Sequence, residues 1–477
     1  MAANRNPSPP PPDSDDPDVH HLQAISDAIG DTVYSQLWVT SLLKELINHL
    51  NREDDEDVHQ QQPIDHGADS SSQATSTKIP MPACIIENDG NLCIAFDEEI
   101  CKLWDMSSDI HVANYLLEIG ILQILIAIIV KSKSARLTEI SVGILANMAC
   151  HRNVCFQMTL YEEIFLIIPM LLQSPDPPIL LESIRLIRSF ISCPNAKEKW
   201  LVTIKENVII YDSITFILAS SVNNDLLRST CCLTYEILYE DDQLLTQWAT
   251  PQLLDALCEA VKQLNGDTRS QENLFLIMQL ISSKNRGVTA LVENETAISL
   301  ICQFMIGYGQ SADSSLQFYS TLTAILSIIN VMMTLHHHLV LKYYIEAPEF
   351  LTATFQFLKF AILKTIPAKD EDASLANFTL DEVQHSSSYD DDGSNVVKYS
   401  RVIVWKFLEI LTSSLAENYN ETILNILLCN CKHQIIAIFE SYRQLAPFYQ
   451  EKLRLFANLF TMTDRHQPFY AYLKERY

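Results

Sequence analysis

Cysteine and histidine residues that lie close together in the sequence are the first candidates for chemistry, because thiolate and imidazole groups bind zinc and act as nucleophiles or bases. Cys429, Cys431 and His433 fall in the run CNCKH, and His336 to His338 are consecutive. Structural zinc needs ligand pairs at fixed spacing, whereas C-x-C on a helix points its thiols about 200° apart. We therefore expect half-buried side chains at helix ends and no metal site.

Nucleotide-binding and catalytic motifs are incomplete or missing. Gly307-Tyr308-Gly309 is a fragment of G-x-G-x-x-G without a preceding strand, and no G-x-x-x-x-G-K-[ST] occurs. The sequence also contains neither G-x-S-x-G nor H-E-x-x-H. We expect no catalytic residue, no cofactor and no small-molecule substrate, so the chain is predicted not to be an enzyme.

A peptide-binding groove is the sharper hypothesis. In armadillo proteins, an Asn on the last helix of a repeat can hold a peptide backbone with its donor and its acceptor, and Asn147 in GILANMA has this setting. Packing or capping within the fold is the other interpretation of Asn147. Arg185 and Arg188 could contact an acidic partner or simply be solvated surface residues. A sustained Asn ladder is not expected, since the corresponding later positions hold Ser189 or Phe190, Tyr235 or Glu236, and Leu280 or Ile281.

The Pro-rich start offers a regulatory site. Ser8 lies in Pro7-Ser8-Pro9, where a proline-directed kinase could add nearly two negative charges. The prolines that follow suit a polyproline II helix, which SH3 and WW domains bind. An unbound flexible tail is the alternative.

Charge is distributed unevenly along the chain, whose net charge is −26. Residues 1–100 contain 19 acids and 4 bases, and residues 368–395 contain 8 acids and 1 base. Because no Lys/Arg-rich run is present to neutralise phosphates, we expect no nucleic-acid partner. The longest apolar stretch, Ile119–Val130, is shorter than the roughly 20 residues that cross a bilayer, so no membrane partner is expected. Without a secretory signal, the 12 cysteines should be mostly buried, reduced thiols.

The elements that must position these residues are helices, since only 10 of 477 residues are Gly. Polar turns at Ser132, Ser174, Ser220, Asn265 and Gly309 are separated by 42, 46, 45 and 44 residues, the period of armadillo or HEAT repeats. One helical pair cannot cover its own apolar face, so neighbouring pairs must stack. The sequence predicts an all-α, armadillo/HEAT-like right-handed helical solenoid, with one irregular helical globule as the alternative.

The predicted domain organisation follows the polar segments. We expect a disordered Pro/Asp tail (1–21), an amphipathic helix docked on the body (22–50), a disordered acidic and polar linker (51–96), and an armadillo-like repeat domain (97–477) interrupted by an acidic loop (367–396). The docked helix is predicted to bury one apolar stripe, made of Val33, Leu37, Trp38, Leu42, Leu46 and Leu50.

Six colinear blocks between the N-terminus and about residue 227 are specific enough to indicate a family. They are RNPSPPPP (5–12), TVYSQLW (32–38), DEEICKLWDMS (97–107), KSKSARLTEISVGILANMAC (131–150), DPPILLES (176–183) and YDSITFILASS (211–221). Together they resemble the serum-amyloid-A-like protein family, also described as synoviocyte-proliferation-associated proteins. The resemblance implies a nuclear, non-enzymatic, armadillo-like protein that promotes cell proliferation, with no catalytic residues to carry over.

We therefore expect a scaffold that binds partner proteins, located in the nucleus with the cytoplasm as a second compartment. The nuclear expectation depends on the resemblance, or on entry with a partner, because no basic import run is present. The alternative function is a nuclear transport or chaperone-like adaptor that binds extended peptides in its groove, which the broken Asn ladder disfavours.

Replacing Leu145 by Asp tests the predicted core. We expect Leu145→Asp to unfold part of the repeat array, because an unpaired buried carboxylate costs several kcal/mol. Thermal melting followed by circular dichroism measures the effect, and an unchanged melt would show that Leu145 is not buried.

Overall fold

The computed structural model describes residues 27–59, 92–309, 318–364 and 394–476. The chain divides into two compact units, Met1–Ile214 and Thr215–Tyr477. The predicted all-α fold is confirmed, since the described residues form helices and contain no β-strand beyond isolated bridge residues such as Ala28 and Ser35.

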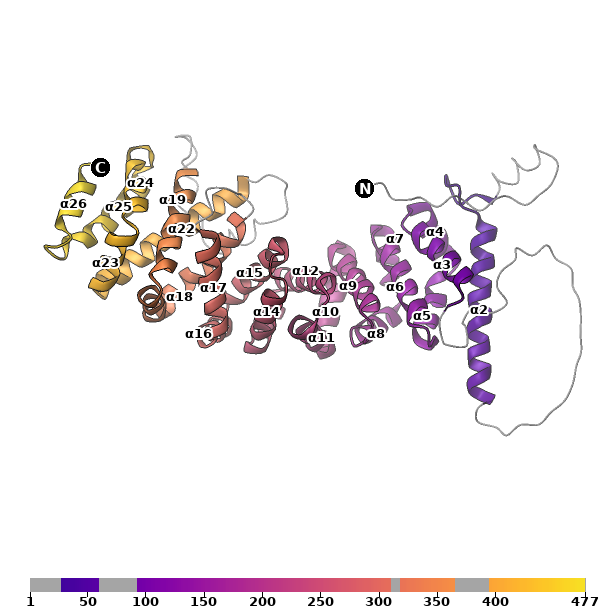
Figure 1. Ribbon diagram of the computed structural model, residues 1–477. Coiled ribbons are helices and arrows are strands. Elements are labelled where there is room, and N and C mark those ends of the chain that lie inside the picture. The colour runs from indigo at the N-terminus through magenta and orange to yellow at the C-terminus, as the bar shows by residue number, and fades with distance from the viewer. Residues whose placement is uncertain (1–26, 60–91, 310–317, 365–393, 477) are drawn as a thin grey trace, which may run out of the picture. The chain divides into compact units, whose positions relative to one another are not determined.

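The helices of the first unit stand next to one another in chain order (Figure 1). They are α2 (Gln36–His59), α3 (Ile94–Met106), α4 (Ile110–Glu118), α5 (Ile121–Lys131), α6 (Ala135–Ala149), α7 (Arg152–Met158), α8 (Glu162–Leu171), α9 (Pro177–Ser192) and α10 (Pro194–Glu206). The next helix, α11 (Val208–Ser220), contains the division between the units.

The second unit continues the same succession of helices. They are α12 (Asn224–Glu240), α13 (Asp242–Trp248), α14 (Pro251–Gln263), α15 (Thr268–Ser282), α16 (Asn285–Glu293), α17 (Glu295–Gly309), α18 (Tyr319–Glu346), α19 (Pro348–Lys364), α22 (Ser394–Glu417), α23 (Glu421–Asn430), α24 (Lys432–Glu440), α25 (Pro447–Asn458) and α26 (Gln467–Lys474), with short 3₁₀ turns η2 (Tyr442–Gln444) and η3 (Leu459–Thr461).

The repeating element is a set of three helices and not the helical pair expected from the sequence. The first helix of each set is short or medium in length, and the examples are α7, α10, α13 and α16. The second helices are α8, α11, α14 and α17. The third helices are α9, α12, α15 and α18, and each is as long as or longer than the second helix of its set. Three helices in about 40 residues is the armadillo form of the repeat.

The predicted turns fall where the second helix of a repeat ends and the third begins. Ser134, Asn223 and Asp267 lie in three of these turns, and each accepts a backbone N–H of the third helix with its side chain. In a fourth turn, Pro177 takes the first position of α9, where no backbone donor is needed. The turn residues are therefore helix caps, which explains why they recur with the period of the repeat. The fifth turn starts as predicted where α17 ends at Gly309, and its following residues, 310–317, lie outside the described part of the chain.

Successive third helices pack on each other within each unit. In the first unit α3 packs on α6 and α6 on α9; in the second, the series runs from α12 through α15, α18 and α22 to α25. Polar side-chain contacts join residues about one repeat apart, as in the bond from Lys199 to the carbonyl of Thr159, 40 residues earlier, and the bond between Asn294 and Asp255, 39 residues apart. These separations support the period read from the sequence.

Helix α2 departs from the prediction at its ends. It packs on α3 and α5, and Trp38, Leu42, Leu46 and Leu50 are buried, as the apolar stripe predicted. The helix begins only at Gln36, however, and Val33 and Leu37 are 78% and 69% exposed, so their place in the stripe is wrong. Asp27 accepts from the backbone N–H of Leu37 and from the Ser35 hydroxyl, which fixes the start of α2 at Gln36, 14 residues after the predicted start at residue 22.

The boundaries of the two acidic segments also change. Helix α2 continues to His59 and α3 begins at Ile94, so the predicted linker 51–96 is helical at both ends. Residues 394–396 of the predicted loop 367–396 belong to α22. The tail 1–21, with Ser8, and the central parts of the linker and loop lie outside the described residues.

Helix α18 is long and apolar enough to cross a membrane by length and composition. Its apolar side chains already have partners, since 61% of its most apolar window is buried and the helix packs on α15, α17, α19 and α22. The backbone of His336 leaves helical geometry (φ −139°, ψ 47°) and kinks the helix.

Most cysteines in the described residues are shielded from solvent. Cys155, Cys193, Cys231, Cys258, Cys302 and Cys431 are buried, and only Cys150 and Cys429 are exposed among the eleven described. Burial raises the pKa of the Cys258, Cys302 and Cys431 thiols to about 12, so these groups stay neutral and behave as small apolar side chains.

Gly143 of α6 provides a test of how closely the third helices pack. A Cβ at this position would lie 2.2 Å from Cε2 of the Trp104 ring on α3. We expect Gly143→Ala to lower the free energy of unfolding by about 1–3 kcal/mol, because the ring must be displaced. Gly307→Ala on α17 is the control, since nothing lies within 4 Å of its added Cβ, and it should keep or raise stability. Urea unfolding measures both, and equal effects would contradict the close packing.

Candidate functional site

Polar side chains on the third helices of the first unit form one connected set from α3 through α6 to α9. We call this set the polar ladder; its members are Asp97 and Trp104 on α3, Arg136, Glu139 and Asn147 on α6, and Glu182 and Arg185 on α9. All seven residues are partly exposed, so parts of the ladder are open to a partner.

Arg136 connects the first two helices of the ladder. Its Nε donates to Asp97 Oδ1 (2.9 Å) and its Nη1 to Glu139 Oε2 (2.8 Å), while the guanidinium lies 5.9 Å from the centre of the Trp104 ring. Burial opposes the charge, but the hydrogen bonds to Asp97 and Glu139 outweigh burial and raise the pKa of Arg136. The cation is thus fixed in place between two carboxylates.

Asn147 joins all three helices. Its Nδ2 donates to the backbone carbonyl of Trp104 (2.7 Å) and to Ser107 Oγ (3.2 Å), and its Oδ1 accepts from Arg185 Nη1 (2.7 Å). Both amide protons and one oxygen lone pair are therefore used within the chain. These hydrogen bonds are those expected if Asn147 packs within the fold. Contact between Asn147 and a peptide stays a prediction, and it would require these hydrogen bonds to break.

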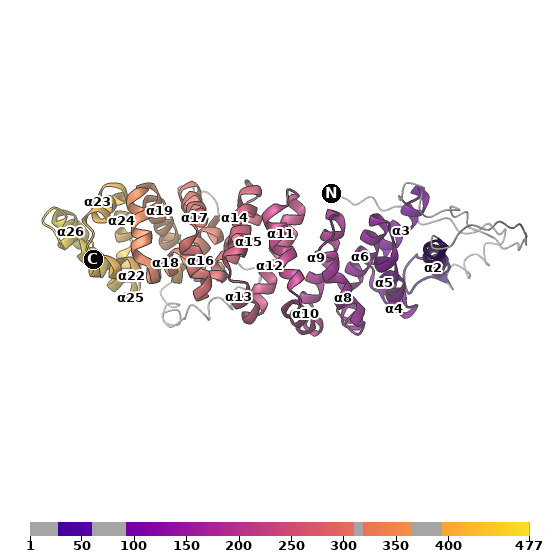
Figure 2. The same ribbon diagram turned by 90° about the horizontal axis from the view of Figure 1, so that it is seen from below.

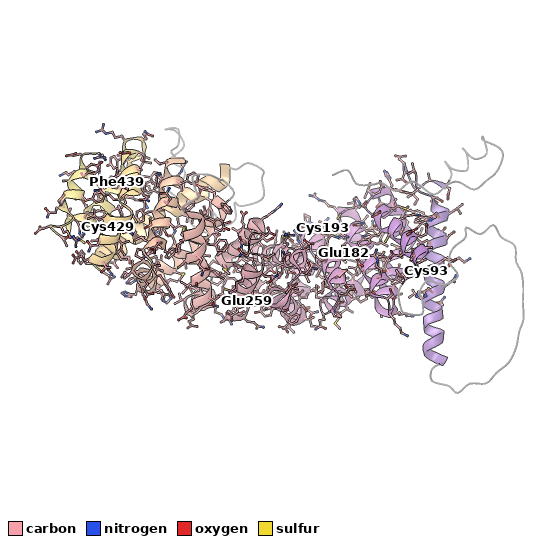
Figure 3. The ribbon with its side chains drawn as sticks, viewed as in Figure 1. Cys93, Glu182, Cys193, Glu259, Cys429 and Phe439 are labelled. Atoms are coloured by element: carbon pink, nitrogen blue, oxygen red, sulfur yellow. The ribbon has the colours of Figure 1, made fainter. Side chains whose placement is uncertain are left out.

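Arg185 completes the ladder on α9. Its Nε donates to Glu182 Oε2 (2.7 Å), and its Nη2 donates to the same carboxylate and to the backbone carbonyl of Gly143 (3.1 Å). Figure 3 shows Glu182 on the ribbon of the first unit. Burial raises the pKa of the Glu182 carboxyl group, although the neighbouring guanidinium of Arg185 acts to lower it. Arg188, about one turn further along α9, is half-buried and also interacts within the chain.

A thiol beside the ladder does not have the character of a nucleophile. Arg136 Nη2 donates to Cys101 Sγ at 3.1 Å, which would favour a thiolate. Burial and the nearby Asp97 carboxylate prevail, however, and raise the pKa of Cys101. The ladder therefore presents fixed charges and hydrogen-bonding groups, and its geometry suits recognition better than proton transfer or nucleophilic attack.

The second unit carries contacts of the same kind between α12 and α15. Arg228 binds Asp267, the residue that caps α15, and Asn273 Nδ2 donates to Cys232 Sγ (3.3 Å). Burial opposes ionisation of Asp267, but hydrogen bonds from Arg228 and Ser270 lower its pKa overall. The Asp267 carboxylate thus caps α15 and also connects two repeats through Arg228.

The metal candidates of the sequence are not assembled into a site. Cys429 is exposed on α23 whereas Cys431 is buried at the end of that helix, and His433 lies on α24. The rings of His337 and His338 are 3.7 Å apart beside the kink at His336. Over residues 27–59, 92–309, 318–364 and 394–476, no group of three or more His, Cys, Asp or Glu side chains could hold a metal ion.

The ladder was not anticipated as a unit, although the sequence holds a signal for part of it. Asp97 and Arg136 are 39 residues apart, as are Arg228 and Asp267, so opposite charges recur at nearly the repeat period. The bonds to the backbone of Trp104 and Gly143 carry no such signal, because every residue has a carbonyl.

Stacked three-helix units with capped turns and contacts one repeat apart define an armadillo-like helical repeat protein. Residues 210–453, about half of the chain, match the family model of the SAAL1 C-terminal domain. The chain therefore belongs to the SAAL1 family, which confirms the resemblance seen in the sequence blocks and extends it beyond residue 227.

Relatives of known name agree with this family. The chain is 32% identical to Protein saal1 of Danio rerio over 316 residues, which cover 63% of this chain and 61% of the relative. It is 30% identical to Protein SAAL1 of Homo sapiens over 289 residues, covering 56% of each. The chain thus spans about three fifths of the length of the curated relatives it matches. The solved structure of an engineered protein is similar with a TM-score of 0.41 and 13% identity, covering 80% of this chain and 88% of that one.

A double-mutant cycle at Asn147 and Arg185 tests the ladder. We expect Asn147→Ala and Arg185→Met each to lower stability, with a coupling energy of about 1 kcal/mol, because either change leaves the other partner unsatisfied. The exposed pair Glu259 and Lys262 on α14 is the control, with an expected coupling below about 0.5 kcal/mol. Urea unfolding of the two cycles measures both energies, and additive effects at Asn147 and Arg185 would contradict the described network.

Proposed function

We propose that this SAAL1-family protein is a non-enzymatic scaffold that binds partner proteins on the surface of its helical repeats. The observation that carries the proposal is the polar ladder. It holds charged groups such as Arg136 and Arg185 in fixed positions on the third helices of successive repeats, α3, α6 and α9. Preorganised charges of this kind favour specific partners, because little side-chain entropy remains to be lost on binding.

The titratable groups support a role without catalysis. The largest pKa shifts among the described thiols and phenols are upward and are caused mainly by burial, as at Cys231 and Tyr344. Such groups are neutral near pH 7 and lie in the packed interior, where no substrate reaches them. Strongly shifted groups at functional sites normally lie in clefts.

We further propose that the protein acts in the nucleus, with the cytoplasm as a second compartment, and promotes cell proliferation. This part rests on the resemblance of its sequence blocks to the serum-amyloid-A-like proteins. Because the sequence has no Lys/Arg-rich import run, the proposal includes entry together with a partner. The partners are proteins, and nucleic acid, membranes and small molecules have no part in the proposal.

The adaptor function is less well supported. An adaptor for extended peptides would use a series of Asn amides, and the amide of Asn147 is already bonded on three sides. The corresponding positions hold Ser189 or Phe190 on α9, Tyr235 or Glu236 on α12, and Leu280 or Ile281 on α15, so none of them supplies an Asn, and Phe190 and Ile281 are fully buried.

Affinity capture with quantitative mass spectrometry tests the scaffold proposal. The bait is the full chain in cells, and the variant Arg136→Met/Glu139→Gln removes ladder charges from α6. We expect a defined set of proteins to lose at least about 80% of its capture, the loss produced by a penalty of roughly 1 kcal/mol on binding. Nuclear imaging and DNA-synthesis labelling after depletion and rescue should show the same dependence on the ladder.

The matched control is Glu259→Gln/Lys262→Gln, which removes an exposed charge pair from α14. Circular dichroism shows whether both variants remain folded. Identical capture by the ladder variant, the control and the unaltered chain would contradict a ladder-based scaffold, and normal DNA synthesis after depletion would contradict the role in proliferation.

A further inference from the structure

A fully buried histidine side chain lies at the start of α26. His466, the residue before this helix, is 0% exposed, and its carbonyl accepts the backbone N–H groups of Phe469 and Tyr470 in the first turn. Helix α26 packs on α25 and η3 and lies beside α23 (Figure 2). The environment of the His466 ring therefore affects how the start of α26 is held in the second unit.

Both ring nitrogens of His466 have partners within the fold. Nε2 lies 3.1 Å from Asn425 Oδ1 on α23, 41 residues earlier, and Nδ1 lies 2.7 Å from the hydroxyl oxygen of Thr463. Because an amide oxygen only accepts, Nε2 carries the proton, and Nδ1 of the neutral ring then accepts from Thr463. The neutral ring thus connects α26 to α23 across one repeat.

The surroundings of the ring oppose a positive charge on it. Phe460 of η3 faces the imidazole edge-on, with the ring centres 6.4 Å apart, so this side of the ring is apolar. Burial is the largest influence and, together with the neighbouring cation of Arg465, lowers the pKa of His466 below its ordinary value of 6.5. Glu421, the first residue of α23, acts in the opposite direction but is outweighed.

Other charged groups on the elements packed here have partners of their own. On α25, Lys452 binds Glu409 of α22, and Arg454 pairs with Glu451 of the same helix. Asp464 accepts from a side-chain amide of α26. The cations of α26 itself lie in and beyond its last turn, at the opposite end from the imidazole. The charge state of the ring therefore depends chiefly on its burial and its two charged neighbours.

We propose that His466 makes the docking of α26 sensitive to acid, so that the helix is held against α23 near neutral pH and is released when the imidazole is protonated. A protonated ring must either remain as a buried charge or move into water, and the move breaks its bonds to Asn425 and Thr463. This inference is independent of the polar ladder and of the scaffold function.

The direction of the pH dependence follows from the lowered pKa. The released helix has an imidazole of ordinary pKa, so it binds a proton more readily than the docked helix does. The contribution of His466 to docking is therefore complete above about pH 6.5 and decreases as the pH falls below this value.

Hydrogen–deuterium exchange of the full chain, measured by mass spectrometry at about pH 7.5 and about pH 5.5, tests the proposal. Rates are corrected for the intrinsic pH dependence of amide exchange. We expect the opening constant of the α26 amides to be between about twofold and tenfold larger at the lower pH, since one histidine contributes no more than this one unit below its ordinary pKa. The amides of α14, which contains no histidine, are the internal reference and should not change.

Two substitutions separate protonation of His466 from other effects of acid. His466→Gln keeps a donor for Asn425 but cannot be protonated in this range, so it should abolish the difference between the two pH values. Arg465→Gln removes a nearby cation, raises the pKa of His466 towards its ordinary value and should reduce the difference. His433→Gln is the matched control, because His433 is exposed on α24 and should leave the difference unchanged.

Circular dichroism shows whether the variants are folded. Equal exchange of α26 at the two pH values overturns the proposal, and so does an undiminished difference in the chain with His466→Gln. If His466→Gln does not fold, Arg465→Gln provides the test, and a difference that this substitution leaves unchanged also overturns the proposal.

Discussion

The burial of apolar helix faces between neighbouring repeats is the constraint on which the rest of the structure depends. Helix α5 has a single polar side chain, Gln123, before its final Lys131, and a repeat that contains such a helix cannot be covered by its own three helices. Each repeat is therefore stable only while the next one packs on it. The third helices provide most of this packing, and the capped turns hold them at the required spacing.

The same packing decides which polar groups remain available for partners. Asn147 and Arg185 both have the right chemistry for peptide recognition, yet each is bonded to a neighbouring helix. A polar group that is partly buried at a helix contact is costly to leave unsatisfied, so it is used first by the fold. Recognition of a partner by the polar ladder would then depend on the exposed parts of side chains that are already held in place, such as the Arg136 guanidinium. It would depend much less on side chains that change conformation.

The fold was more accessible from the sequence than the site was. The period and the turns could be predicted because caps such as Ser134, Asn223 and Asp267 are required wherever a third helix begins. The first helices α7 and α13 were missed because each has only seven residues, too few for a periodic apolar pattern. Val33 was placed in the apolar stripe because the helical spacing of apolar residues extends to positions before Gln36. The helix itself starts at Gln36, where Asp27 accepts the backbone N–H of Leu37, and Val33 is exposed.

The candidate site depends on register, which a single sequence does not contain. Asn147 reaches the carbonyl of Trp104 only because Gly143, one turn earlier on α6, leaves room for the indole ring. Neither residue reveals the other by type or spacing. Opposite charges at the repeat period, as in Asp97 and Arg136, are the one part of the ladder that the sequence could have indicated.

Hydrogen bonds between repeats of the first unit, such as those of Arg136, Asn147 and Lys199, join residues about 40 positions apart, which has a consequence for how this unit forms and comes apart. Closing a loop of this size costs nearly the same entropy anywhere along the chain, so any repeat can act as a folding nucleus for its neighbours. A pull on either end of the first unit is then expected to detach its helices stepwise from the terminus, because these bonds reach only the neighbouring repeat. The extension of such a unit is expected to rise in steps with the applied force, one step for each repeat that detaches.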